Sequence, residues 1–216
     1  MKHVRNMVVA FAALLALSAV VTATASAAKP EFLPLKAGEK YKGESKVTSK
    51  LATEKKGTIE CTKNKESGET TGTTGKTGVL TVDFEGCTVF GIANAHSLGD
   101  ASNIILVHGT TTLCYINAAN KEVGIVIHPE PVHIEVAGKL VEVKGSVIGH
   151  LTPINSSKTG PYKAAFTQSG GKQTVTKCEG GATETLLTAE NEGTFENSAE
   201  EATDEFSFEK AVELMA

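Results

Sequence analysis

The sequence predicts an all-β protein, an antiparallel β-sandwich or a flattened barrel with about ten short strands and two disulfides. Short segments of alternating apolar and polar residues recur along the 216-residue chain, and turns rich in glycine or proline separate them. Segments with a helical period are few. The chain has an even number of cysteines, as two disulfide bonds require.

Residues 1–27 are predicted to be a cleaved secretory signal peptide. Lys2 and Arg5 give it a basic start, residues 7–21 are almost continuously apolar, and the small residues 25–27 form the cleavage pattern. The apolar run is short for a membrane span, which takes roughly 20 residues. We therefore expect a secreted, extracellular protein with no membrane span after the signal is cleaved.

The rest of the chain is expected to form a lysine-rich, partly extended segment over residues 28–57 and a β-rich domain over residues 58–216. Residues 28–65 contain ten lysines and five glutamates, whereas residues 179–216 contain eleven acidic residues and one lysine. We expect both charged ends to be solvated surface. The alternative is attraction between them, within one molecule or between two.

The composition argues against nucleic acid as a partner. Arg5 is the only arginine, and the chain has no tryptophan and three tyrosines. Guanidinium forks for phosphates and aromatic platforms for bases are therefore missing after the signal. The GKT within residues 68–78 is not a phosphate-binding loop, because Thr70 stands where that motif requires its first glycine.

The first predicted strands are separated by glycines. Residues 47–51 predict a weak edge strand, and residues 58–62 predict a strand that ends near the first cysteine. Residues 68–78 contain four glycines and predict a loop or tight turns. Residues 103–108 predict a strand covered on both faces, and residues 111–116 predict its hairpin partner, with a turn between them.

Residues 79–90 form the clearest strand of the first half. Leu80, Val82 and Phe84 share one face by strict alternation. Gly86 then predicts a bulge or bend that brings the following cysteine to its partner.

Residues 123–153 contain the densest run of β-branched side chains. Alternation from Val123 onward predicts one strand, which two prolines end because proline has no amide donor. A hairpin that turns at residues 138–139 then pairs Val136 with Val141. In this register the residues that face the core are Ile134, Val136, Val141 and Val143.

The outer face of this hairpin holds the candidate site of an enzyme. His133 and Glu135 share that face, the register sets Glu142 opposite Glu135, and His128 and His150 lie at neighbouring strand ends. Imidazole and carboxylate are zinc ligands, and a bound cation would relieve the repulsion between the two glutamates. However, no HExxH or similar spacing is present, and nearby lysines can neutralise the pair. We favour a solvated strand face and expect no cofactor.

Four cysteines allow three disulfide pairings, of which we favour Cys61–Cys87 with Cys114–Cys178. A metal site would need closer ligand pairs, such as CxxC.

The C-terminal third continues the strand pattern. Residues 162–166 and 172–178 predict strands on either side of a turn, and residues 183–189 and 193–197 predict weaker ones. Residues 198–216 are compatible with a helix, for which Ser198 and Glu201 can form a capping box. The surrounding pattern favours a strand, in which the apolar face comprises Phe206, Phe208, Val212 and Leu214.

Four segments resemble a group of secreted proteins from actinobacterial genomes to which no activity is assigned: TVDFEGCTVFG, LCYINAANKEVGIVIHPEPVHIEV, KLVEVKGSVIGHLTP and FSFEKAVELM. The resemblance extends over residues 57–215. It implies an exported β-rich domain and implies no catalytic residues.

We expect a non-catalytic structural or binding protein with a protein, matrix, glycan or cell-surface partner. The alternative is an extracellular hydrolase, metal-dependent or carboxylate-based, that uses the His/Glu cluster of the central hairpin. A carrier of a small apolar ligand is a third hypothesis, and it requires a hollow interior.

Overall fold

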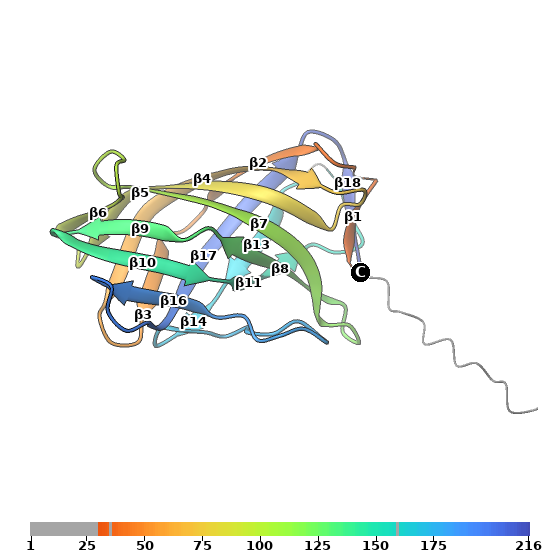
Figure 1. Cartoon of the computed structure of the whole chain (residues 1–216). Coiled ribbons are helices and arrows are strands. Elements are labelled where there is room, and N and C mark those ends of the chain that lie inside the picture. The colour runs from red at the N-terminus through yellow and green to blue at the C-terminus, as the bar shows by residue number, and fades with distance from the viewer. Residues whose placement is uncertain (1–29, 35, 159) are drawn as a thin grey trace, which may run out of the picture.

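A computed structural model describes residues 30–34, 36–158 and 160–216, so the predicted signal peptide lies outside the described residues (Figure 1). The prediction of an all-β, antiparallel fold is confirmed, although several strands are longer than expected. The strands are β1 (Glu31–Leu33), β2 (Lys40–Ser45), β3 (Ser49–Thr53), β4 (Thr58–Thr71), β5 (Thr77–Val89), β6 (Ala93–Ser97), β7 (Ile104–Asn117), β8 (Glu122–Pro129), β9 (Val132–Val136), β10 (Lys139–Gly145), β11 (Val147–Thr152), β12 (Ser157–Lys158), β13 (Tyr162–Phe166), β14 (Gln168–Ser169), β15 (Lys172–Gln173), β16 (Leu186–Glu190), β17 (Glu196–Phe208) and β18 (Val212–Met215).

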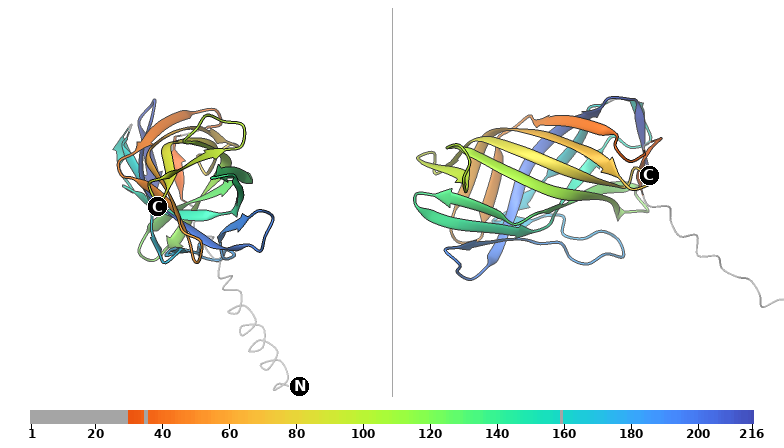
Figure 2. Two further views of the ribbon diagram at one scale, coloured as in Figure 1. Left: turned by 90° about the vertical axis from the view of Figure 1, so that its left-hand side faces the viewer. Right: turned by 45° about the horizontal axis from the view of Figure 1, so that its top comes forward.

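The main sheet closes on itself and forms an elongated barrel (Figures 1 and 2). At one end the hydrogen-bonded circuit runs β17, β13, β11, β8, β7, β5, β4 and β2, and back to β17. At the other end it runs β17, β16, β10, β9, β6, β5, β4 and β3, and back to β17. The long strands β4, β5 and β17 therefore belong to both circuits.

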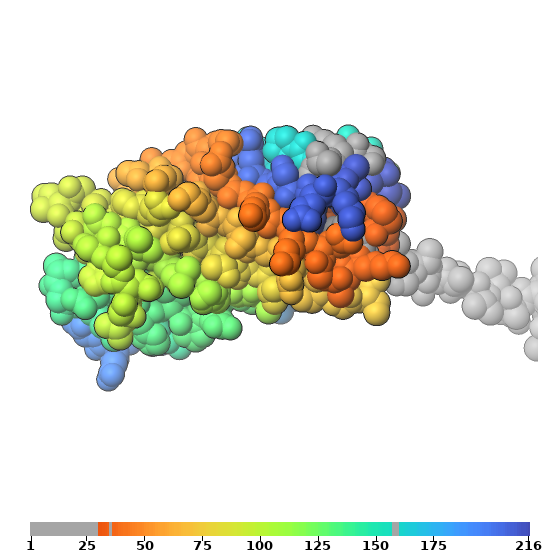
Figure 3. All heavy atoms as spheres, turned by 90° about the horizontal axis from the view of Figure 1, so that it is seen from above, coloured from red at the N-terminus to blue at the C-terminus, as the bar shows by residue number. Residues whose placement is uncertain are grey.

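The N-terminal and C-terminal strands lie side by side. β2 and β3 of the lysine-rich segment both pair with the acidic strand β17, and β1 pairs with β18. Figure 3 shows the orange N-terminal residues against the blue C-terminal ones on one face of the molecule. The lysine-rich segment is thus part of the barrel wall, and Lys210 of the C-terminal segment pairs with Glu39 at 2.8 Å.

Two different cores fill the two ends of the barrel. The end near β1 and β18 is aromatic, and its rings lie 4.9–6.2 Å apart between centroids: Phe32, Tyr41, Tyr162, Phe206 and Phe208. The end near the β9–β10 hairpin is aliphatic and surrounds the disulfide Cys61–Cys87. This disulfide links directly opposed residues of β4 and β5, as predicted.

The predicted distortion at Gly86 is confirmed, and it reverses the inward face of two strands. Odd positions of β4 face the core up to Cys61, whereas even positions face it from Asn64 onward. On β5 the change runs from even positions such as Val82 to Cys87, which is fully buried. Gly86 itself has a φ of 67°, which glycine adopts without strain. Without this reversal Cys87 would point to solvent.

The second predicted disulfide, Cys114–Cys178, is also present and holds a segment outside the barrel. Residues 167–185 follow β13 and contain only the short hairpin β14–β15. Part of this segment covers the outer sides of Val126 and Ile148, which are buried although they face away from the barrel interior. The disulfide therefore fixes a small satellite core to the outer wall.

Three local predictions are corrected by the structure. The central hairpin turns at Ala137 and Gly138, both with positive φ, so Val136 pairs with Lys139 and not with Val141. The shift is two residues, so the inward face is the predicted one.

The predicted turn at Gly109 is absent, because β7 continues through it. A Cβ there would lie 2.7 Å from a carbonyl oxygen of β8, which accounts for glycine at this position.

The loop within the glycine-rich stretch at residues 68–78 is shorter than predicted. β4 extends to Thr71 and β5 begins at Thr77, so the turn occupies residues 72–76. At the C-terminus, the preference for strand is confirmed: β17 and β18 place Phe206, Phe208, Val212 and Leu214 in the core.

Candidate functional site

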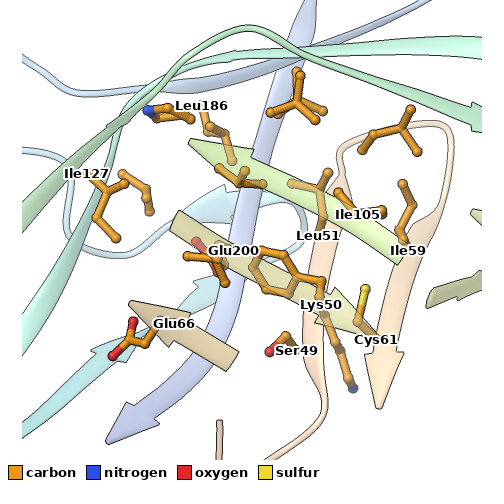
Figure 4. Close-up of a pocket in the computed structure, with 18 of the residues that line it drawn as sticks. Ser49, Lys50, Leu51, Ile59, Cys61, Glu66, Ile105, Ile127, Leu186 and Glu200 are labelled. Carbon is orange, nitrogen blue, oxygen red and sulfur yellow. The ribbon is translucent and has the colours of Figure 1, made fainter. Parts of the chain in front are cut away.

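The aliphatic end of the barrel contains a cavity of about 100 Å³ (Figure 4). Most of its wall is apolar and comes from both circuits of the sheet. The apolar lining includes Leu51, Ile59, Leu80, Val82, Phe84, Ile105, Val107, Ile127, Val132, Ile134, Val143, Val147 and Leu186. Cavities of similar size with wholly apolar walls accept small apolar guests.

Three carboxylic acids line the same cavity: Glu66 of β4 and Glu200 and Asp204 of β17. Figure 4 shows the side chains of Glu66 and Glu200 among the apolar ones. Alternation explains the positions on β17, because the even residues that include Phe206 face the core. On β4, Glu66 faces inward because the inward face of that strand reverses before Asn64.

A buried polar network holds Asp204. Asn64 is 1% exposed, and its Nδ2 donates to Asp204 Oδ1 at 2.9 Å and to Ser49 Oγ at 3.3 Å. The network lies where the barrel wall is interrupted: the β2–β4 ladder ends at Glu44 and the β3–β4 ladder begins at Ser49. The side-chain hydrogen bonds of Asn64 connect β4 with β3 and β17 at this point.

Glu66 and Glu200 are held differently. The Oε1 atom of Glu66 is buried without a hydrogen-bond partner. It lies over Gly43 of β2, where a Cβ would overlap both this oxygen and the Glu205 carbonyl oxygen of β17. Glu200 is fixed through its main chain, because its N–H donates to Gln173 Oε1 at 3.0 Å and its carbonyl accepts from Gln173 Nε2 at 3.2 Å. Its carboxylate is left to the cavity.

The environment disfavours the charged forms of all three acids. Burial raises the pKa of Glu66 to about 8, and the nearby Asp204 and Glu200 add to this shift. Burial, with Asp204, likewise raises the pKa of Glu200 to about 8. Burial raises the pKa of Asp204 to about 6, although the hydrogen bond from Asn64 opposes the shift.

No cation in the described part of the chain compensates these acids. The ion pairs found there involve other carboxylates. Lys50 is the one basic residue in the lining, and its Nζ lies 3.7 Å from Glu60 Oε1 with 37% of its side chain exposed. Its charge is therefore at the surface and not beside the buried acids.

The predicted His/Glu cluster lies on the outer surface of the β9–β10 hairpin. The structure sets Glu142 opposite His133, whereas the sequence predicted Glu135 opposite Glu142. Glu135 instead lies opposite Leu140 and, on its other side, opposite His96 of β6. The two glutamates are thus not directly opposed, and the predicted repulsion between them is reduced.

The remaining candidates do not join this cluster. His128 lies in β8 opposite Thr110, and His150 lies in β11 between other partners. Lys144 lies 3.7 Å from Glu142 Oε1 and 3.5 Å above the ring centroid of Phe195. Over residues 30–34, 36–158 and 160–216, no group of three or more His, Cys, Asp or Glu side chains is placed to hold a metal ion.

Searches of protein-family models, of curated proteins and of solved structures found no match to this chain. In the residues that the structure describes, no helix has the length and apolar character needed to cross a membrane.

Proposed function

We propose that this protein is a secreted, non-catalytic binding protein that takes a small, largely apolar ligand into the barrel. The observation that carries the proposal is the apolar cavity inside a closed sheet. The carrier hypothesis requires such a hollow interior. Barrel interiors commonly serve as ligand sites, because a closed wall removes most of the ligand surface from water.

The size of the cavity limits the ligand. A space of about 100 Å³ is below the roughly 300–1,000 Å³ of pockets for drug-sized molecules. It suits a guest of a few heavy atoms, or the end of a longer chain. For such small ligands the binding free energy reaches at most about −1.5 kcal/mol per heavy atom. We therefore expect affinities from millimolar to micromolar.

Secretion is part of the proposal. Two disulfides are compatible with an oxidising compartment outside the cell, where such bonds persist. The predicted signal peptide supports the same location. A protein or cell-surface partner that delivers or receives the ligand is consistent with this proposal.

The proposal is tested by access of an apolar guest to the cavity. Xenon dissolved under pressure should shift the methyl NMR signals of the lining residues and leave those of the satellite core unchanged. Leu186→Phe fills the cavity from β16 and should abolish these shifts. Leu187→Phe is the matched control, because the neighbouring side chain is not part of the lining. Absence of any xenon effect on the lining methyls of the wild-type protein would refute the proposed function.

A further inference from the structure

We propose that the interior site recognises an organic cation: a small apolar ammonium ion whose charged end meets Glu66, Glu200 and Asp204. This inference rests on the proposed function and names the class of ligand. The apolar wall would contact the hydrocarbon part of the ligand, and the three acids would receive its N–H donors.

Most polar side chains that line the cavity are carboxylic acids. Its lining contains three carboxylic acids and the hydroxyl of Ser49, while the amine of Lys50 is engaged at the surface. A site for a carboxylate or phosphate would need donors such as arginine, and the described residues contain none. A cation is therefore the ligand whose charge complements this lining.

The acids are positioned in a way that leaves acceptors free. Glu66 Oε1 is buried without a partner, and Gly43 provides the space that keeps it inside the wall. A buried acceptor without a donor is destabilising, so a ligand that supplies a donor relieves this cost. Asn64 satisfies one oxygen of Asp204 and fixes its orientation. An alkylammonium group has three N–H donors for such a set of acceptors.

A metal ion fits less well than an organic cation. Metal ions need several ligands at short distances around one point, and the described acids form no such group. The large apolar share of the wall also has no role in binding a bare ion. An ammonium ion with a short hydrocarbon chain uses both parts of the cavity.

Protonation of the empty site gives the binding a characteristic pH dependence. Because burial raises the pKa of Glu200 and of Glu66 to about 8, the empty site is largely protonated at neutral pH. Binding of an ammonium ion favours the ionised acids and releases a proton. The affinity should therefore rise up to about tenfold per pH unit below pH 8 and level off above it.

The test compares butylammonium with butan-1-ol, which has the same chain and no charge. Titration calorimetry at pH 8 should give butylammonium at least about tenfold tighter binding, because hydrogen bonds to charged groups are roughly twice as strong as neutral ones. Repeating the titration in buffers of different ionisation enthalpy should show the proton release. Glu200→Gln should remove the preference for butylammonium and retain binding of butan-1-ol.

The matched control is Glu205→Gln, which neutralises a glutamate on the opposite face of the same strand and should leave both affinities unchanged. Circular dichroism and the urea midpoint establish that both variants are folded. Equal affinity of the wild-type protein for the two probes, with xenon entering the cavity, would overturn the cation inference and leave the proposed function standing. A preference for butylammonium that survives both Glu200→Gln and Glu66→Gln would place the cation elsewhere and also overturn it.

Discussion

Replacing Glu200 by glutamine should change how the stability of the protein depends on pH. The pKa of Glu200 rises from its ordinary value of 4.5 to about 8 on folding, so the folded protein binds more protons than the unfolded chain between these values. The contribution of Glu200 to stability is therefore fully present below about pH 4.5 and is lost as pH rises towards 8. Each unit of pKa shift corresponds to about 1.36 kcal/mol. Ionisation of Glu200 should therefore lower the free energy of unfolding by about 4 kcal/mol between pH 5 and pH 9. Glu200→Gln removes this loss.

Urea unfolding with both disulfides intact measures the effect, followed by far-ultraviolet circular dichroism because the chain has no tryptophan. Relative to wild type, Glu200→Gln should gain stability progressively from pH 5 to pH 9. Glu205→Gln, on the outer face of β17, should follow the wild-type pH dependence. A constant difference between Glu200→Gln and wild type at all pH values would show that Glu200 titrates normally and is not held in a desolvated interior.

Three further predictions concern the rest of the fold. Gly86→Ala should lower the free energy of unfolding by about 1–3 kcal/mol and by more than Gly91→Ala, since both glycines have positive φ but only the first lies against a facing side chain; equal urea midpoints would contradict this. Removing the Cys114–Cys178 bond by a double serine substitution should cost about 4 kcal/mol for a separation of 64 residues, and unchanged thermal unfolding would show that the satellite core is held by packing alone. His133→Ala should change stability by less than about 0.5 kcal/mol, as expected for an exposed strand position, and elemental analysis should find no bound metal; stoichiometric zinc would instead support the hydrolase alternative.

The buried acids show where the sequence-based prediction failed and which signal was present. The C-terminal glutamates were expected to be solvated because of their number. Phe206 and Phe208 were nevertheless assigned to an apolar face, and the same alternation traced back along the strand reaches Asp204 and Glu200. The strand period therefore predicted that these acids face inward, but the acidic composition of the segment led to the opposite expectation. Glu66 could not be placed in this way, because the reversal of the inward face near Gly86 changes the period within β4 and β5.

The central hairpin gives the opposite lesson. Its inward residues were predicted correctly although the turn was misplaced, because a shift of two residues preserves the face of every side chain. The predicted cross-strand pairs on its outer face were wrong, because any shift of register changes which residues lie opposite one another. The predicted Cys61–Cys87 disulfide was right because these cysteines lie on consecutive strands joined by a short turn, and its formation leaves only Cys114 and Cys178 to pair. Closure of the sheet was not predictable from local pattern, because it depends on β17 pairing with strands far away in the sequence.

The membership of β17 in both circuits has a consequence for the order of folding. Until residues 196–208 are in place, β2 and β3 have free edges on one side, and so do β13 and β16 on the other. Free edges are templates for aggregation, and pairing between distant segments is slow. One strand near the end of the chain therefore seals both ends of the molecule together. A chain shortened before β17 would lose both closures at once, and with them Glu200 and Asp204, two of the three acids of its interior site.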